Sequence, residues 1–260
     1  MWSLFFSFNL IFIDAVKPMN KPLHIGLLLC HSFEDILDTV GGLDYSAIFR
    51  QQLLAVDPNI TFSDFSVHEG EFPKSVDQCD VWLVNGSPEG VYDDIPWIHT
   101  LSDFIKQLDT AKKPTVGICF GHQLMAQVLG GKVELSGKGW GIGLSHNTIV
   151  ADTAYMQPKT SKIDVMVFHQ DQVVQLPSGS KVLAKSDFCP NYMVEYNPHM
   201  LGIQGHPEFT AKMIEGILSY ETYAKHPTLR AQGMANLKGQ PDMQLLFGWM
   251  VNFYRQAAHP

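Results

Sequence analysis

Residues 114–131 read PTVGICFGHQLMAQVLGG, and the fold prediction starts from the turn inside this stretch. An apolar strand leads into Cys119, and the next residues have the spacing of a helix that ends at a glycine pair. Gly117 and Gly121 flank the cysteine in a G-x-C-x-G pattern. A sharp strand-to-helix turn needs such small neighbours and places strained dihedral angles on its middle residue. We therefore expect the Cys119 sulfur to project at the carboxyl edge of a sheet, where open α/β sheets bind ligands.

Strand and helix patterns alternate around this turn. Buried or alternating apolar runs predict strands at 23–29, 59–67, 80–86 and 114–119, and helical spacing predicts helices at 44–56, 97–111 and 121–131. Beyond Gly131, short strand candidates are separated by turns at 143–150, 162–170, 181–186, 191–196 and 200–204. The sequence thus predicts an α/β fold: a flavodoxin-like, open, mostly parallel sheet with helices on both faces, plus added antiparallel strands.

The C-terminal part predicts helices at 208–224 and 242–256, with a loop-like stretch, partly helical at most, between them. We expect residues 19–260 to form a single domain whose last helix is an extension docked on the core. Residues 1–18 stand apart. Their apolar run, 4–13, is too short to span a bilayer and lacks the basic residues that open a signal peptide. We expect Met19 to be the biological start and residues 1–18 to be an extra segment, with a signal peptide as the alternative.

Composition limits the class of protein. Hydrophobic residues make up 45% of the 260 residues and the formal net charge is −8, which is ordinary for a globular protein and argues against a nucleic-acid surface. The four cysteines are not paired in the spacing of a zinc site; they are Cys30, Cys79, Cys119 and Cys189. We expect reduced thiols in a cytoplasmic protein, no metal or cofactor, and no membrane partner.

A second segment offers the base that a cysteine nucleophile needs. In GIQGHPEF, residues 202–209, His206 and Glu208 are two positions apart and Pro207 favours an extended backbone. Alternate side chains of an extended segment share a face, so Glu208 can orient the His206 imidazole while the imidazole faces Cys119. The alternatives are a structural cysteine and a turn with a surface histidine. The order of the two segments favours the catalytic interpretation.

A third segment can stabilise the negative charge of an oxyanion that forms when the cysteine attacks a carbonyl group. VNGSPEG, residues 84–90, leaves the neighbouring strand, and Gly86 lets its backbone approach the site without a bulky side chain. One donor from this turn and the N–H of Phe120, directly after the nucleophile, would make a two-amide oxyanion hole.

These segments resemble the class I, or triad, glutamine amidotransferase superfamily over residues 23–209. GICFGHQLMAQVLGGKV is similar to the nucleophile segment of that superfamily, and GIQGHPEF to its His-x-Glu segment. The resemblance implies that Cys119 is the nucleophile, His206 the general base and acid, and Glu208 the residue that orients it. It also implies the remaining site residues: oxyanion amides at Ser87 and Phe120, and substrate contacts at Gly86, Gln123, His169 and Asp171.

Two departures refine the resemblance. Members fused to a synthase usually have Phe where this chain has Gly205, and two glycines where it has Gly86 and Ser87. Both departures indicate the stand-alone branch, which is similar to the glutaminase domain of GMP synthase and includes the γ-glutamyl peptidases. About fifty residues follow Phe209, fewer than the roughly 100 of a typical domain, so we expect no synthetase domain there. No P-loop is visible either.

Three functions remain open. The first is cysteine-dependent hydrolysis of the γ-amide of glutamine or of a γ-glutamyl compound through a thioester, and its possible partner is a separate synthase subunit. The second is a γ-glutamyl peptidase that acts on a larger substrate. The third is a catalytically silent binding or regulatory protein on the same scaffold.

Among the other residues, His146 and His169 are candidates for the pocket, His122 is expected to pack or cap, and residues 31–42 are either a lid or a plain connection.

Overall fold

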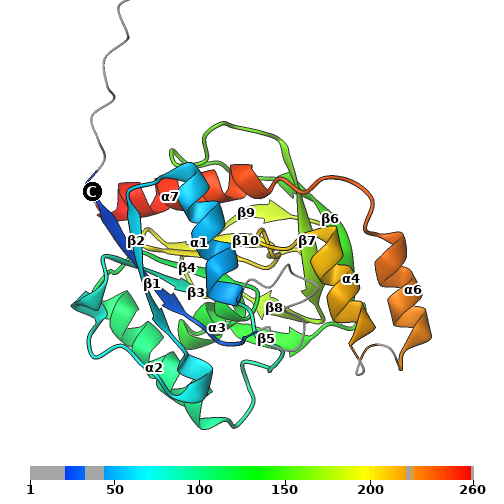
Figure 1. Cartoon of the computed structure of the whole chain (residues 1–260), viewed down its shortest axis with the longest axis horizontal. Coiled ribbons are helices and arrows are strands. Elements are labelled where there is room, and N and C mark those ends of the chain that lie inside the picture. The colour runs from blue at the N-terminus through cyan, green and yellow to red at the C-terminus, as the bar shows by residue number, and fades with distance from the viewer. Residues whose placement is uncertain (1–20, 33–43, 221–222, 224, 259–260) are drawn as a thin grey trace, which may run out of the picture.

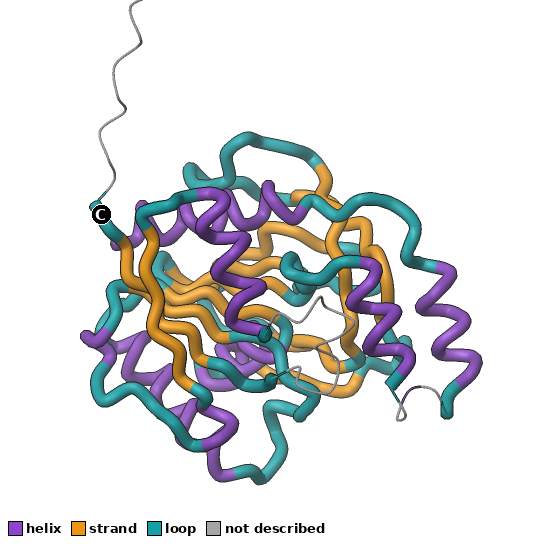
Figure 2. Tube along the Cα trace, in the orientation of Figure 1, coloured by secondary structure: helices purple, strands orange, loops and turns teal. Residues whose placement is uncertain are grey.

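The computed structural model describes residues 21–32, 44–220, 223 and 225–258. The extra segment 1–18 and most of the lid candidate therefore lie outside the described residues. The described part contains a large sheet that forms one layer through the molecule (Figure 2). Its strands are β1 Leu23–Leu28, β2 Ile60–Phe65, β3 Val81–Val84, β4 Thr115–Ile118, β6 Gly141–Ile149, β7 Lys162–His169, β9 Lys181–Lys185, β10 Met193–Asn197 and β11 Met200–Ile203.

The sheet has nine strands in the order β2-β1-β3-β4-β11-β10-β9-β6-β7. The first five of these are parallel to one another, which is the flavodoxin-like arrangement that the sequence predicts. One detail of the prediction is wrong, because the segment 200–204 was grouped with the antiparallel additions. Strand β11 instead pairs in parallel with β4 and is antiparallel only to β10. All four of its residues are buried, as in a strand that is covered on both faces.

Helices cover both faces of the sheet (Figure 1). Buried residues of α1, α4 and α7 share one hydrophobic cluster, and those of α2 and α3 share the other. The described α-helices are α1 Tyr45–Val56, α2 Pro96–Thr110, α3 Phe120–Val128, α4 Ala211–Ser219, α6 Pro227–Ala235 and α7 Met243–Ala258, with short 3-10 helices at Val67–Glu69 and Val76–Gln78. The carboxyl ends of the parallel strands are thereby held between two packed layers.

The C-terminal helix α7 docks on the core, as predicted. Trp249, Phe253 and Tyr254 are buried, and the Tyr254 hydroxyl donates a hydrogen bond to the carbonyl of Trp82 at 2.9 Å. These contacts agree with an amphipathic helix whose apolar side faces the protein. None of the described helices is both long and apolar enough to cross a membrane.

The part of the chain after Gly131 also departs from the prediction in three other places. Strands β5 Lys132–Leu135 and β8 Asp171–Gln175 form a small second sheet that the sequence analysis missed. Helix α4 covers only nine residues of the predicted 208–224, because residues 208–210 still belong to the turn after β11. Helix α6 is a regular helix with one buried residue, and its weak amphipathic pattern explains why the sequence predicted mainly a loop there.

Candidate active site

Cys119 lies in a strained turn between β4 and α3. Its backbone has φ 50° and ψ −100°, a region that residues other than glycine rarely adopt. A Cβ atom at Gly117 would come within 2.5 Å of the Gly121 backbone, and one at Gly121 within 2.4 Å of the Val84 carbonyl oxygen. The two glycines therefore allow the tight approach of α3 to β3 and β4, as the G-x-C-x-G pattern predicts. The Cys119 N–H also donates to the carbonyl of Ile203 at 2.8 Å, which joins the turn to the end of β11.

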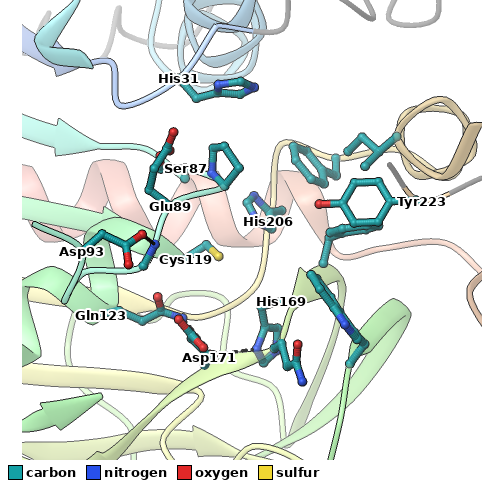
Figure 3. A pocket seen from close by; sticks show the side chains of 18 of the residues that line it. His31, Ser87, Glu89, Asp93, Cys119, Gln123, His169, Asp171, His206 and Tyr223 are labelled. Carbon is teal, nitrogen blue, oxygen red and sulfur yellow. Dashed lines mark hydrogen bonds between the residues drawn. The ribbon is translucent and has the colours of Figure 1, made fainter. Parts of the chain in front are cut away.

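His206 follows β11 and lies next to Cys119 in the cavity (Figure 3). Its N–H donates to the carbonyl of Met166 at 2.7 Å, and its ring stacks on Phe209 with the two centroids 4.0 Å apart. The imidazole Nδ1 hydrogen-bonds the Glu208 carboxylate at 2.7 Å, and the ring lines the cavity beside the Cys119 sulfur. The structure thus brings together the three side chains that the sequence analysis singled out.

Electrostatics favour a protonated His206. Burial alone would lower its pKa, but the Glu208 carboxylate and the Cys119 sulfur outweigh burial and raise the pKa to about 10. Glu208 itself is buried, so solvent screens its attraction to the imidazole only weakly. At neutral pH the ring therefore carries a proton beside the sulfur, and a neighbouring cation is a standard means of activating a cysteine.

Tyr45 is a site residue that the sequence analysis missed. It is the first residue of α1, and its hydroxyl donates to the same Glu208 oxygen at 2.7 Å. A Cβ atom at Gly86 would come within 2.7 Å of His206 Cε1 and 3.4 Å of this hydroxyl. Gly86 therefore makes room for the His206 ring and the Tyr45 hydroxyl. No local motif marks Tyr45, because its partner is 163 positions away in the sequence.

A second missed residue is Gln204, whose side chain is completely buried. Its amide nitrogen donates to Cys119 Sγ at 3.6 Å, and its amide oxygen accepts from Gln123 at 3.2 Å. Gln123 also donates to the backbone carbonyl of Asp171 at 2.8 Å. These hydrogen bonds between amide groups connect the end of β11, helix α3 and strand β8 next to the Cys119 sulfur. Gln204 lies in the GIQGHPEF segment, two positions before His206, and this position was a usable signal.

The two residues predicted for the oxyanion hole lie at the expected turns. Phe120 is the first residue of α3, and the first N–H groups of a helix have no partner within the helix. Ser87 lines the cavity, and its hydroxyl donates to the carbonyl of Cys30 at 3.1 Å and also bonds the Glu89 carboxylate. The Ser87 side chain is thus held by its own turn, while the oxyanion role concerns its backbone amide.

His169 and Asp171 line the same cavity. His169 Nδ1 hydrogen-bonds the carbonyl of Asp171 at 3.0 Å, and burial lowers the pKa of this histidine to about 4. The Asp171 carboxylate accepts from the Tyr92 hydroxyl at 2.9 Å, and burial raises its pKa. An imidazole with a lowered pKa and a carboxyl group with a raised pKa therefore line the cavity on the side away from Ser87 (Figure 3).

Two other histidines lie outside the cavity lining. His146 was a candidate for the pocket, but its side chain is exposed and pairs with Asp164 at 2.8 Å, so that prediction is wrong. His122 packs, as predicted. It is completely buried beside Tyr196, whose hydroxyl lies 2.9 Å from its Nδ1, and burial lowers its pKa to about 3.

The cavity has a volume of about 500 Å³. Among its lining residues, Cys119, Gln123 and His206 are buried, and we call their side of the cavity the inner part. The aromatic side chains of Trp140 and Phe168 are partly buried, and they belong to what we call the outer part. Within the described ranges, no group of three or more His, Cys, Asp or Glu residues is arranged to hold a metal ion.

Comparisons with known proteins show the family to which the chain belongs. The sequence model of the family described as glutamine amidotransferase class-I matches residues 42–218. The chain belongs to the class I glutamine amidotransferase family. The resemblance that the motifs predicted is therefore confirmed, and so is the fold class that it implied.

The individual relatives of this family member include two kinds of protein, γ-glutamyl peptidases and a component of a GMP synthase. γ-Glutamyl peptidase 5 of Arabidopsis thaliana is 37% identical over 161 residues, which are 59% of this chain and 64% of the peptidase, slightly under two thirds of its length. One component of the glutamine-hydrolysing GMP synthase of Sulfolobus acidocaldarius is 34% identical over 148 residues, which are 55% of this chain and 77% of that component. A glutamine amidotransferase of Thermotoga maritima shares the fold, with a TM-score of 0.72 over 93% of this chain and all of its own, at 18% identity.

Proposed function

We propose that this protein hydrolyses the γ-amide bond of a γ-glutamyl compound, with Cys119 as nucleophile and a γ-glutamyl thioester as intermediate. The observation that carries the proposal is the arrangement of one imidazole between two partners. His206 hydrogen-bonds Glu208 at 2.7 Å, and Cys119 lies beside the same ring in the cavity. A nucleophile, a base and an orienting group in hydrogen-bond reach are the minimum for covalent acyl transfer.

In the first half-reaction, the Cys119 thiolate attacks the δ-carbonyl carbon of the γ-glutamyl group. A C–S bond forms, and the carbonyl electron pair moves to the oxygen. The Ser87 and Phe120 amides hold this oxyanion. When the carbonyl reforms, the C–N bond breaks and the protonated His206 gives its proton to the departing nitrogen. An amine, or ammonia from glutamine, leaves the site.

In the second half-reaction, His206 accepts a proton from water while the water oxygen attacks the thioester carbon. The tetrahedral intermediate collapses, the C–S bond breaks, and the γ-carboxyl group of glutamate is released. Cys119 returns as the thiolate and His206 remains protonated for the next turnover. Glu208 holds the imidazole in one orientation throughout. Gly86, Gln123, His169 and Asp171 are proposed to contact the glutamyl part of the substrate, because they line the same inner cavity, near the sulfur.

The two groups of relatives support two different functions for a protein with this chemistry. The similarity to γ-glutamyl peptidases supports a self-sufficient hydrolase, which is the function we favour. The similarity to a component of GMP synthase supports a second candidate, a glutaminase that passes ammonia to a separate synthase. The four cysteines are free thiols, which supports a reducing, cytoplasmic location.

The test is to assay the purified protein alone on glutamine and on a γ-glutamyl dipeptide, next to the Cys119→Ala variant. The proposal predicts release of the second amino acid from the dipeptide by the wild type and no release by the variant. Turnover of glutamine alone, stimulated by an added synthase, would favour the second candidate. Equal activity of the wild type and the variant would remove Cys119 from the mechanism.

A further inference from the structure

The cavity is larger than its catalytic end requires. Its volume of about 500 Å³ falls within the roughly 300–1,000 Å³ of pockets that hold drug-sized ligands. If ammonia were the leaving group, only the glutamyl group would need to be enclosed. The additional space has a lining of its own, which differs in chemistry from the lining next to Cys119.

Three aromatic side chains form this additional wall. Trp140 precedes β6, Phe168 lies in β7, and Tyr223 follows α4, and all three line the cavity. Each pair meets edge to face, with ring centroids 5.5 Å apart for Trp140 and Phe168, 5.9 Å for Trp140 and Tyr223, and 4.9 Å for Phe168 and Tyr223. Edge-to-face packing fixes the three rings against one another. The wall is therefore a preformed apolar surface.

The wall lies on the side where the leaving group departs. Figure 3 shows His206 between Cys119 and Tyr223, with Glu89 and Asp93 on the opposite side of Cys119. The proposed general acid must face the nitrogen that leaves, so the substituent on that nitrogen extends past His206. The next surface on that path is the aromatic wall. The glutamyl end, with its ammonium group, then occupies the side that carries the carboxylates.

The charges of the cavity lining further limit which substituents the leaving amine can carry. Among the described residues, the cavity lining includes the acidic side chains of Glu89, Asp93 and Asp171 and includes no Lys or Arg. A leaving group with a carboxylate near the aromatic wall would lose its hydration without gaining a cationic partner, which is costly. An uncharged aromatic or alkyl substituent gains from burial against the rings.

We propose that Trp140, Phe168 and Tyr223 form a leaving-group subsite, and that the preferred substrates are γ-glutamyl amides of amines with an aromatic or long alkyl substituent and no carboxylate. The proposal rests on the proposed hydrolysis and specifies its substrate class. It places specificity in the leaving amine, whereas the glutamyl group is common to every substrate of the reaction.

The experiment compares three substrates with the same glutamyl group: the γ-glutamyl amides of ethylamine, 2-phenylethylamine and phenylalanine. The phenylethylamide differs from the ethylamide by a phenyl ring. The phenylalanine compound differs from the phenylethylamide by a carboxylate. We expect kcat/KM for the phenylethylamide to exceed that for the ethylamide by about tenfold, the effect of partly burying a phenyl ring. We expect the phenylalanine compound to fall below the phenylethylamide.

Variants connect the preference to the wall. Phe168→Ala and Trp140→Ala should each bring the ratio of kcat/KM for the phenylethylamide over the ethylamide down towards one. Phe72→Ala is the matched control, since Phe72 is a partly buried phenylalanine that packs in the cluster on the opposite face of the sheet. That variant should keep the wild-type ratio. An unchanged ratio in both wall variants would overturn the subsite.

Failure of the subsite and failure of the proposed function give different results. If the wild type hydrolyses all three substrates with similar kcat/KM, and Cys119→Ala hydrolyses none, the function stands and the subsite is wrong. If the phenylalanine compound is hydrolysed as fast as the phenylethylamide, the exclusion of a carboxylate is wrong. If the wild type hydrolyses none of them, calorimetry with the Cys119→Ala variant decides. Tighter binding of the phenylethylamide than of the ethylamide supports the subsite, and equal or no binding overturns it.

Discussion

The inner and outer ends of one cavity are built from different parts of the fold. The inner end comes mainly from the turns after the parallel strands β3, β4 and β11, with His169 and Asp171 added from β7 and β8. Most of its polar side chains are buried, and several are hydrogen-bonded to one another. The outer end comes from the antiparallel addition around β6 and β7 and from Tyr223, and its wall consists of aromatic rings. In our proposal, the parallel core supplies the reacting groups, and the antiparallel addition supplies the surface that binds the substituent of the leaving amine.

This difference between the two ends indicates which amino-acid substitutions each end tolerates. Atoms at the inner end must hold their positions to a few tenths of an ångström, because hydrogen bonds and proton transfer depend on distance. Apolar contacts at the outer end depend mainly on buried area and tolerate substitutions of similar volume. Variants of the inner end should therefore lower every activity, whereas variants of the outer end should change the order of preference among substrates.

The largest effect is expected from Cys119→Ala. Removal of the proposed nucleophile should lower kcat by about 10⁴-fold or more, while circular dichroism and thermal unfolding stay close to those of the wild type. Cys79→Ala is the control, because Cys79 is a free, buried cysteine in the other hydrophobic cluster. Full activity of Cys119→Ala would break the assignment of chemistry to the inner end.

Glu208→Gln comes next. The amide keeps the volume of the side chain but removes the charge that raises the pKa of His206, so kcat should fall by about 10³-fold. The wild-type imidazole keeps its proton until the pH approaches about 10, and the alkaline limb of kcat/KM should lie there. In the variant the pKa of His206 is lower, so this limb should move to lower pH.

The control for this pH profile is Glu195→Gln, which removes a carboxylate that accepts from Tyr155 outside the cavity lining. Its profile should match the wild type. An alkaline limb that stays in place in Glu208→Gln would contradict the coupling of Glu208 to His206.

Gly121→Ala tests the packing under the inner end. The new Cβ would lie 2.4 Å from the Val84 carbonyl oxygen, so the free energy of unfolding should fall by about 1–3 kcal/mol. Gly248→Ala is a matched change of a helical glycine with no atom within 4 Å of the new Cβ, and it should raise stability by up to about 1 kcal/mol. Urea denaturation measures both. Equal stability of the two variants would show that α3 does not require its close approach to β3.

The smallest of these effects is expected from Tyr45→Phe. Loss of the hydroxyl removes one hydrogen bond to the Glu208 carboxylate, so kcat should fall by about tenfold, the value of one hydrogen bond to a charged group. KM should change little, because Tyr45 acts through Glu208 on His206. Tyr155→Phe, which removes a similar bond to Glu195, should leave kcat unchanged. A large rise in KM for Tyr45→Phe, with kcat unchanged, would instead indicate contact with the substrate.

The inner end could be predicted from the sequence because its signals are local. Gly117, Cys119 and Gly121 lie within five positions, and His206 and Glu208 are two positions apart. Alternation of strands and helices then placed both segments at one edge of the sheet. Tyr45 and Gln204 were missed because their roles come from contacts across the fold and not from spacing along the chain.

The outer end could not be predicted in the same way. Trp140, Phe168 and Tyr223 lie in three separate segments, and nothing in an aromatic residue by itself distinguishes a cavity wall from a core position. The small sheet of β5 and β8 was missed because β5 has only one buried residue and because a single residue separates β8 from the end of β7. The parallel pairing of β11 was also missed, although a run of four buried residues is typical of a parallel strand.

The main claim is that the sulfur of Cys119 is the nucleophile that reacts with the glutamyl substrate, and mass spectrometry can test it. The protein is treated with a glutamine analogue that carries a diazoketone in place of the amide, then digested and analysed. We predict one adduct, on the peptide that contains Cys119, and much slower labelling in Glu208→Gln. Labelling of Cys30, Cys79 or Cys189 with Cys119 unmodified, in a protein that still hydrolyses γ-glutamyl amides, would contradict the claim.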